Sequence, residues 1–142
     1  MGCDFSSSPS KRKPIVVAIG RTHRGTVLLD RLIHFQTLPD FLDFLKQPTT
    51  DNTPCVAGFD LPFGLPRQFV ESMNWPTTWP ECMDKFVSHS REELRQFFKA
   101  FCDARPAGAK FAHRATDMPA GSSPSMKWVN PPVAYMLHAG VP

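Results

Sequence analysis

The hydrophobic pattern of the first 35 residues predicts three strands. Residues 1–6 alternate apolar with small or polar side chains, and the runs 15–20 and 26–35 have the composition of strands. Residues 7–14 lack apolar side chains and predict an exposed hairpin loop, while residues 22–25 predict a second turn. Three strands joined by such turns form an antiparallel meander.

After residue 37 the spacing of apolar residues becomes that of a helix. The segment 38–46 places four apolar side chains on one broad helical side: Phe41, Leu42, Phe44 and Leu45. Thr37 is suited to cap this helix and Pro48 to end it, and residues 47–54 are expected to form a polar linker.

A short apolar run over residues 55–59 leads directly to Asp60. An unbroken run of this kind is typical of a central strand that is buried on both faces of a sheet. A helix that connects the meander to a following parallel strand should make a right-handed crossover. Such a crossover places Asp4 and Asp60 on neighbouring strands of one sheet, in the order that opens the ribonuclease-H-like fold.

The second half of the chain is predicted to be helical. Its strongest helix signal is the segment 90–102, which begins with the capping-box residues Ser90 and Glu93. An apolar stripe at helical spacing follows: Leu94, Phe97, Phe98, Phe101 and Cys102. Shorter helices are expected over residues 67–73 and 131–139.

The remaining segments of the second half are predicted to be irregular. Residues 74–80 are rich in Trp and Pro, and residues 104–126 are rich in Gly, Ser, Pro and basic residues, which favours a long loop. We therefore predict an α/β fold with a mixed sheet in which residues 1–65 are a ribonuclease-H-like strand core. Residues 66–142 are then a helical and loop-rich extension of the same domain.

Composition narrows the class of protein without identifying it. A chain of 142 residues is long enough for one compact domain, and a net charge of +3 fits an anionic partner without requiring one. The four cysteines lack metal-ligand spacing and indicate buried, reduced thiols: Cys3, Cys55, Cys82 and Cys102. There is no signal-peptide pattern and no apolar stretch of about 20 residues. We expect a soluble, cytoplasmic protein with no membrane partner.

Asp4 and Asp60 are the candidate metal ligands. A carboxylate on a central strand is costly to bury unless a cation or hydrogen-bond donors neutralise it. Two carboxylates at adjacent strand positions repel each other, and Mg²⁺ or Mn²⁺ between them removes this repulsion. Such a metal can activate water and stabilise the leaving oxygen of a phosphodiester. The alternative is that Asp4 starts a turn with the serines that follow it and Asp60 caps the segment at Pro62.

Three short motifs carry a resemblance to a known family. They are G-C-D-F-S-S-S-P at 2–9, A-G-F-D-L-P-F-G-L-P at 57–66 and R-A-T-D at 114–117. Together they resemble the domain of unknown function 429 family, whose members are predicted to be ribonuclease-H-fold nucleases. The resemblance implies that Asp4 and Asp60 bind the metal, and that Arg114 and Asp117 belong to a polar motif near the same cleft.

The chain departs from this pattern in its carboxylates. Ribonuclease-H-like enzymes usually have a third or fourth carboxylate on a later strand or on the final helix, whereas this sequence stops at Pro142 directly after a predicted helix. We therefore expect an incomplete fold, with Asp117 as the candidate for the missing catalytic role. A truncated fragment and an inactive homologue are alternatives to an active nuclease. An open sheet edge would also favour homo-oligomers.

Other residues are candidates for contact with nucleic acid. Four basic residues before and within the R-A-T-D motif could bind phosphate: Arg105, Lys110, His113 and Arg114. Three tryptophans could stack unpaired bases, although packing of loops onto the core is the more common role: Trp75, Trp79 and Trp128. The basic run at residues 11–13 is expected to be an ordinary exposed turn. Four histidines show no ligand spacing and are expected to be structural or exposed: His23, His34, His89 and His138.

Two other functions compete with the nuclease hypothesis. A phosphotransferase of the sugar-kinase and actin superfamily shares the same core sheet, and in it residues 4–8 together with Lys11 would grip a phosphate while Asp60 would hold Mg²⁺. Against it, this hairpin lacks the glycine that phosphate loops use for close backbone approach. A non-catalytic binding module of the same fold is the third hypothesis. It predicts that Asp4→Asn and Asp60→Asn are neutral or stabilising.

Overall fold

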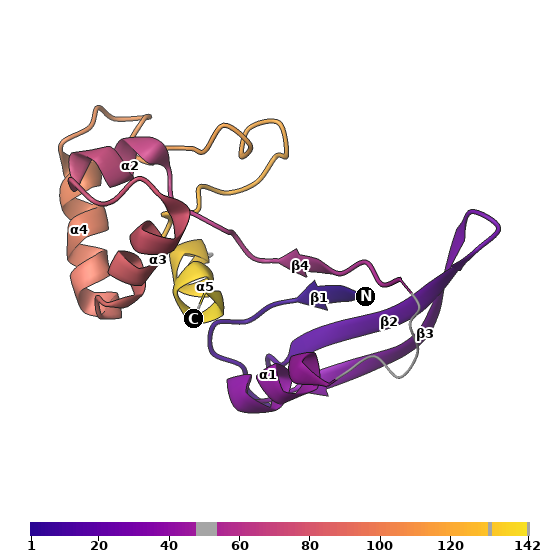
Figure 1. The fold of residues 1–142 in the computed structure, drawn as a ribbon. Helices are drawn as coiled ribbons and strands as arrows, with labels where there is room; N and C mark the ends of the chain where they lie inside the picture. The colour runs from indigo at the N-terminus through magenta and orange to yellow at the C-terminus, as the bar shows by residue number, and fades with distance from the viewer. Residues whose placement is uncertain (48–53, 131, 142) are drawn as a thin grey trace. The chain divides into compact units, whose positions relative to one another are not determined.

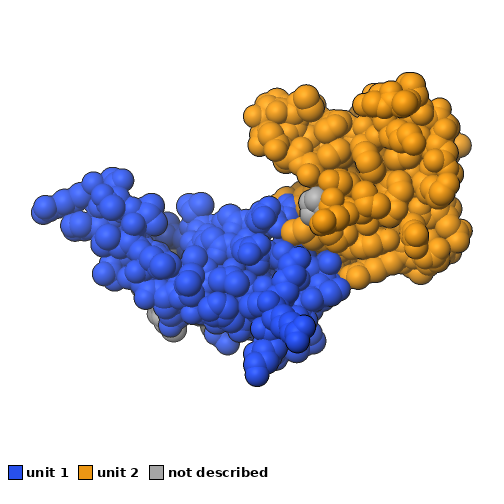
Figure 2. Space-filling model, turned by 180° about the vertical axis from the view of Figure 1, so that it is seen from behind, with its two compact units in different colours: residues 1–61 blue, residues 62–142 orange. Residues whose placement is uncertain are grey.

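The structure is a computed structural model that describes residues 1–47, 54–130 and 132–141. The described residues form an α/β structure with a four-stranded mixed sheet and five helices, divided into two compact units (Figures 1 and 2). Residues 1–61 contain the sheet and the first helix, and residues 62–142 contain the other helices. The assignment of both parts to one domain, divided after residue 65, stays a prediction.

The three predicted antiparallel strands are confirmed. β1 (Gly2–Asp4), β2 (Ile15–His23) and β3 (Thr26–Phe35) form the meander, and β2 continues three residues beyond its predicted end. β4 (Gly58–Asp60) pairs with β1 in parallel, so the order of strands is β3-β2-β1-β4 (Figure 1). The prediction that the first strand lies next to the strand that ends at Asp60 is therefore confirmed.

A tight turn and a bulge shape the β2–β3 hairpin. Arg24 and Gly25 have φ values of 48° and 78°, and two successive positive values match the twist of a two-residue hairpin turn. At Gly20 the pairing register shifts by one residue, which leaves Asp30 of β3 as the extra residue. The Asp30 carboxylate pairs with the Arg21 guanidinium at 3.0 Å, on the partner strand beside the bulge.

Helix α1 (Leu38–Lys46) has the predicted bounds. The Thr37 hydroxyl oxygen accepts a hydrogen bond from the backbone N–H of Asp40 at 3.2 Å, which confirms the predicted cap. Pro48, which was expected to end the helix, lies outside the described residues, as does most of the predicted linker over residues 47–54.

The core of residues 1–61 is small and aromatic. The Phe41 ring of α1 is 3% exposed, and its centroid lies 5.6 Å from that of Phe35 and 6.1 Å from that of Phe5. The prediction of a broad apolar side is wrong in part, because Leu42 and Leu45 are 43% and 39% exposed. A helix of nine residues on this narrow sheet buries only one residue fully.

The expectation that residues 55–59 form a central strand buried on both faces is wrong. β4 lies at an edge of the described sheet, Val56 is 86% exposed, and Cys55 is exposed rather than a buried thiol. Apolar composition records a preference for burial, whereas pairing decides where a strand lies in the sheet. Among the described residues, β1 is the only strand that pairs with β4, so its other edge is open.

Residues 62–142 form a helical unit with its own core. Its helices are α2 (Arg67–Ser72), α3 (Trp79–Val87), α4 (Arg91–Asp103) and α5 (Val133–Gly140). The largest fully buried apolar side chains of this core are aromatic or aliphatic: Phe69, Phe86, Phe98, Leu94, Met126 and Leu137. Every buried residue of this cluster lies after residue 62, so the core of the helical unit contains no residue of the sheet.

The predicted helix with a capping box is confirmed as α4. The Ser90 backbone N–H donates to the Glu93 carboxylate at 2.8 Å, and the Ser90 hydroxyl oxygen accepts from the Glu93 backbone N–H at 3.3 Å. The predicted stripe faces the core, with Leu94, Phe98 and Cys102 buried.

Helix α3 was not predicted, and it begins within residues 74–80, which were expected to be irregular. Thr78 is its N-cap residue, Pro80 lies in its first turn, and the Thr78 hydroxyl donates to the Glu81 carboxylate at 2.5 Å. The T-x-x-E pattern before Cys82 is therefore a helix-start signal that the cluster of Trp and Pro hid.

The last two predictions of secondary structure hold for the described residues. Residues 104–126 contain neither helix nor strand. Helix α5 ends at Gly140, one residue after the predicted end of the last helix. Pro131 and Pro142 lie outside the described residues. Within the described ranges, no helix is both long and apolar enough to cross a bilayer.

Candidate functional site

Asp4 and Asp60 lie opposite each other on the parallel strands β1 and β4. In this pair Cys3 faces Phe59 and Asp4 faces Asp60, so the two strands are in register. Opposite residues of paired strands point to the same face of a sheet, and neighbouring strands are about 4.8 Å apart. The fold therefore brings together the two carboxylates that the sequence singled out.

The two carboxylates stand in a row that crosses the whole sheet. Register partners place these residues in one row: Asp60, Asp4, Val16 and His34. The adjacent row consists mostly of small residues: Gly58, Gly2, Ala18 and Leu32. A Cβ atom added at Gly2 or Gly58 would meet no atom within 4 Å, so the sheet surface beside the carboxylates is open.

His34 belongs to this row but was expected to be only structural or exposed. It is exposed and lies two strands from Asp4, which corresponds to about 10 Å. If the register next to the hairpin turn continued without a bulge, Val16 would pair with Ile33. His34 would then lie on the face of the sheet opposite to Asp4. The bulge at Gly20 shifts the register by one residue and brings the imidazole onto the carboxylate face.

The electrostatic environment of the pair differs from the one expected. The prediction that Asp4 and Asp60 are buried on central strands is wrong, because both side chains are exposed. Cys3 is buried on the opposite face of β1, and this burial raises the pKa of its thiol to about 11, with the charges of Asp4 and Asp60 adding to the rise. The Cys3 thiol therefore remains protonated and inert at neutral pH.

The donor set fits a hydrated divalent ion. Mg²⁺ commonly binds proteins through one or two carboxylates and keeps several waters. Among the described residues, no group of three or more His, Cys, Asp or Glu side chains is placed to hold a metal. Asp4 and Asp60 could thus provide two anchoring ligands and leave the other coordination positions to water or phosphate oxygens.

Arg114, which is half-buried, and Asp117, which is fully buried, form an ion pair in residues 62–142. The Asp117 side chain is 0% exposed, and its Oδ1 accepts from Arg114 Nη2 at 2.7 Å and from Nε at 2.8 Å. Its Oδ2 accepts from the Arg114 backbone N–H at 2.8 Å. Burial alone would raise the pKa of this carboxyl, but the hydrogen bonds and charge of Arg114, with a smaller contribution from Ser122, hold the pKa below its usual value.

These contacts organise the loop that carries the pair. The Ser122 backbone N–H donates to the Asp117 carbonyl oxygen at 2.9 Å, so residues 114–122 are closed into a compact turn around the carboxylate. Both carboxylate oxygens of Asp117 are already occupied, which favours a structural role over metal binding. The catalytic roles expected for Arg114 and Asp117 stay predictions.

The hairpin between β1 and β2 does not resemble a phosphate-binding loop. Ser10 and Lys13 exchange backbone hydrogen bonds of 3.0 and 3.2 Å, and residues 10–13 are exposed, which confirms the predicted turn. Every residue from 5 to 14 is described, and none has a positive φ. Concave nests of backbone N–H groups need such conformations, so the phosphotransferase alternative gains no support.

The three tryptophans have different environments. Trp75 is 7% exposed and stacks on His89, with ring centroids 5.4 Å apart, and Trp128 stacks on Phe98 at 5.9 Å. Trp79 is instead 52% exposed. Packing onto the core is therefore confirmed for two of them, and Trp79 is the one whose ring remains available to a ligand.

No family model, no curated protein and no solved structure matches the chain.

Proposed function

We propose that the protein is a metal-dependent nuclease with a ribonuclease-H-like sheet, in which Asp4 and Asp60 hold Mg²⁺ or Mn²⁺. The observation that carries the proposal is the in-register pairing of these two carboxylates on parallel strands. The strand order supports the fold assignment, because an antiparallel meander is followed by a helix and then by a strand parallel to the first.

The carboxylate face has the properties that a phosphodiester substrate needs. Asp4 and Asp60 anchor the ion at the edge of the sheet, and the glycines beside them leave room for a sugar-phosphate backbone. When bound, the ion polarises the phosphodiester and lowers the pKa of a coordinated water. His34, in the same row, is positioned to donate a hydrogen bond to a neighbouring phosphate oxygen.

The charge of the chain supports a nucleic acid as the substrate. The net charge is +3, and the exposed turn that follows β1 carries three consecutive cations, Lys11, Arg12 and Lys13. Lysine and arginine near a metal site attract the phosphate backbone irrespective of sequence. We therefore propose contacts to the backbone rather than readout of bases for this part of the molecule.

Isothermal titration with MnCl₂ tests the metal site. The wild-type chain should bind Mn²⁺ at one site, and Asp4→Asn and Asp60→Asn should each abolish this binding, because one carboxylate alone holds the ion weakly. Asp43→Asn is the matched control, since Asp43 is an exposed helical carboxylate 3.7 Å from Lys46. Absence of Mn²⁺ uptake by the wild type would overturn the proposal.

Cleavage of labelled single-stranded and duplex RNA and DNA in Mn²⁺ then tests the activity. We expect product formation by the wild type and by Asp43→Asn, and none by Asp4→Asn or Asp60→Asn. Activity that survives in both variants at the metal site would show that the chemistry lies elsewhere.

A non-catalytic relative of the same fold is the second candidate. It is favoured by the lack, among the described residues, of a third ligand beside the two carboxylates. In this case Asp4→Asn and Asp60→Asn should raise the Tm slightly, because charge repulsion is removed, and Mn²⁺ should leave the Tm of the wild type unchanged. A Tm that rises with Mn²⁺ only when both carboxylates are present contradicts this candidate.

A further inference from the structure

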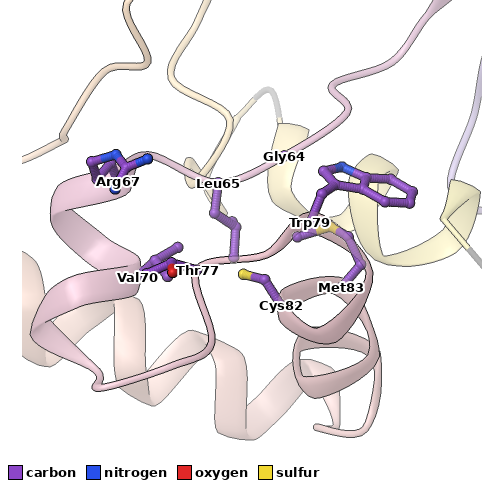
Figure 3. Close-up of a pocket in the computed structure, with 8 residues that line it drawn as sticks. All are labelled: Gly64, Leu65, Arg67, Val70, Thr77, Trp79, Cys82 and Met83. Carbon is purple, nitrogen blue, oxygen red and sulfur yellow. The ribbon is translucent and has the colours of Figure 1, made fainter.

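A pocket of about 210 Å³ lies within the helical unit and is lined by residues of that unit (Figure 3). It is formed by the segment before α2, by α2 itself, by Thr77 in the segment that leads into α3, and by the first turns of α3. The volume is below the roughly 300–1,000 Å³ of sites for drug-sized ligands, so the pocket suits a single small ring system.

The floor of the pocket is apolar and one wall is aromatic. Leu65, Val70, Cys82 and Met83 are buried lining residues. Figure 3 shows the Trp79 indole at one end of the pocket and Arg67 at the other. The Trp79 indole N–H donates a hydrogen bond to the Phe63 carbonyl oxygen, which fixes the ring although half of its surface is exposed.

Arg67 is the cation of this pocket. Its guanidinium lies 3.5 Å from the Glu71 carboxylate one helical turn away, and both side chains are largely exposed. Exposed pairs of this kind contribute little stability, so an anion can recruit the guanidinium without a large loss. Thr77 adds a hydroxyl group to the same lining.

We propose that this pocket binds one unpaired nucleobase against Trp79, with the adjoining phosphate on Arg67. The inference rests on the proposed function, because it assumes that the ligand is nucleic acid. A base is planar and apolar on its faces and is joined to an anion, which matches a fixed indole, an apolar floor and a single arginine. Stacking of bases on aromatic side chains does not depend on sequence and requires the base to be unpaired.

Fluorescence anisotropy of a labelled octathymidylate in EDTA tests the proposal. Trp79→Ala should weaken binding about 30-fold, which corresponds to the middle of the range for loss of one stacked base. Arg67→Ala should also weaken it and should reduce the slope of log K against log salt by about 0.7, the value for one phosphate contact on a single strand. Met118→Ala and Arg95→Ala are the matched controls, since Met118 is 72% exposed and Arg95 forms an exposed pair with Glu92 at 3.9 Å.

Two further measurements keep the test decisive. Trp79→Phe retains an aromatic face and should bind within a few-fold of the wild type, which separates stacking from loss of structure, and circular dichroism checks folding of each variant. A fully paired, blunt-ended duplex, which has no unpaired bases, should bind equally to the wild type and Trp79→Ala. If Trp79→Ala and Arg67→Ala fold and bind the octathymidylate as the wild type does, the pocket proposal is wrong.

The outcome is distinguishable from failure of the metal site, because EDTA removes divalent ions. Loss of oligonucleotide binding on Trp79→Ala, together with no Mn²⁺ uptake by the wild type, retains the base pocket and rejects the nuclease. If the wild type binds Mn²⁺ at Asp4 and Asp60 and Trp79→Ala does not change oligonucleotide binding, the metal site is retained and the base pocket is rejected. Displacement of a weakly bound oligonucleotide by a peptide with an aromatic C-terminal residue, at equal concentration, would assign the pocket to peptides and overturn the inference.

Discussion

Asp117 and Ser125 are both fully buried, but only the aspartate has its polar side-chain atoms paired. Arg114 occupies both carboxylate oxygens of Asp117 through its side chain and its backbone N–H. The Ser125 hydroxyl has no hydrogen-bond partner among the described residues. A buried charge that is well paired and a buried hydroxyl that is not should respond to substitution in opposite directions.

Arg114→Ala should destabilise the chain by about 3 kcal/mol, because it removes the charged partner of the buried Asp117 carboxylate and leaves it only the backbone N–H of residue 114 and the Ser122 hydroxyl. Chemical denaturation at pH 7 measures this change as a lower midpoint. Arg95→Ala, which removes an exposed pair in the same unit, is the control and should change the free energy of unfolding by less than about 1 kcal/mol. Equal effects of the two substitutions would contradict a structural role for the Arg114–Asp117 pair.

The same pair predicts a dependence of stability on pH. The pKa of Asp117 is lower in the folded state than in the unfolded chain, where it is about 3.9. Its contribution is therefore fully present above about pH 4 and is lost as the pH falls through the folded pKa. Denaturation of the wild type and Asp117→Asn between pH 2 and 6 should show a steeper loss of stability for the wild type below about pH 4. Parallel curves would contradict the prediction.

Ser125→Ala should stabilise the chain by about 1 kcal/mol, since it removes a buried hydroxyl that no described group satisfies. Thermal unfolding should give a higher Tm. Ser72→Ala is a suitable comparison, because the Ser72 hydroxyl donates to the Phe69 carbonyl oxygen at 2.7 Å and its loss should not stabilise. A lower Tm for Ser125→Ala would indicate that an internal water bonds to the hydroxyl.

At the scale of elements, the bulge in the β2–β3 hairpin decides which side chains share the carboxylate face. It lies at Gly20, where an added Cβ atom would meet the Leu28 carbonyl oxygen across the hairpin. A glycine is therefore required by the close approach of the two backbones. Beyond the bulge the register places His34 in the row of Asp4.

Gly20→Ala should destabilise residues 1–61 by at least about 1 kcal/mol, because the methyl group forces the two strands apart. Hydrogen exchange should show faster exchange of the amides of β2 and β3 than in the wild type, with the amides of α4 unchanged. Ala18→Gly, on the same strand, is the comparison: it adds backbone freedom without a clash, costs about 0.5–1 kcal/mol and should speed exchange less than Gly20→Ala does. Unchanged exchange in the hairpin would show that the bulge tolerates a side chain.

At the scale of the whole molecule, strand β3 of the sheet exposes several apolar side chains. Val27, Leu29 and Leu32 of β3 are 75%, 62% and 52% exposed, and β4 has an open edge among the described strands. Exposed apolar side chains next to unpaired strand edges favour association. We propose that copies of the chain associate through the sheet.

The double substitution Val27→Lys, Leu29→Lys should reduce this association, because two charges replace the most exposed apolar residues of β3. Light scattering after size exclusion should give a mass that rises with concentration for the wild type and stays at that of one chain for the variant. Val129→Lys, at a 48% exposed position of the helical unit, should behave as the wild type. A wild-type mass that does not change with concentration would rule out the proposal.

Local signals were sufficient for the elements that depend on neighbours in the sequence. The meander, the bounds of α1 and the capped helix α4 follow from alternation, turn residues and caps, which act within a few residues. The apolar run before Asp60 was misread because composition cannot distinguish an edge strand from a central one. The start of α3 lies in a segment whose Trp and Pro content favours a loop, so the Thr78–Glu81 pattern is the local signal for this helix.

The sequence alone determined that Asp4 and Asp60 end up on neighbouring strands, since the order of strand, hairpin, helix and strand leaves few pairings. Only the tertiary structure decided that both carboxylates are exposed, that a bulge turns His34 to their face, and that Trp79 stays accessible while the other two tryptophans pack. Exposure and register depend on contacts between segments far apart in the chain. The sequence pattern shows which segments favour a helix, a strand or burial. It does not show which segments contact each other in the fold.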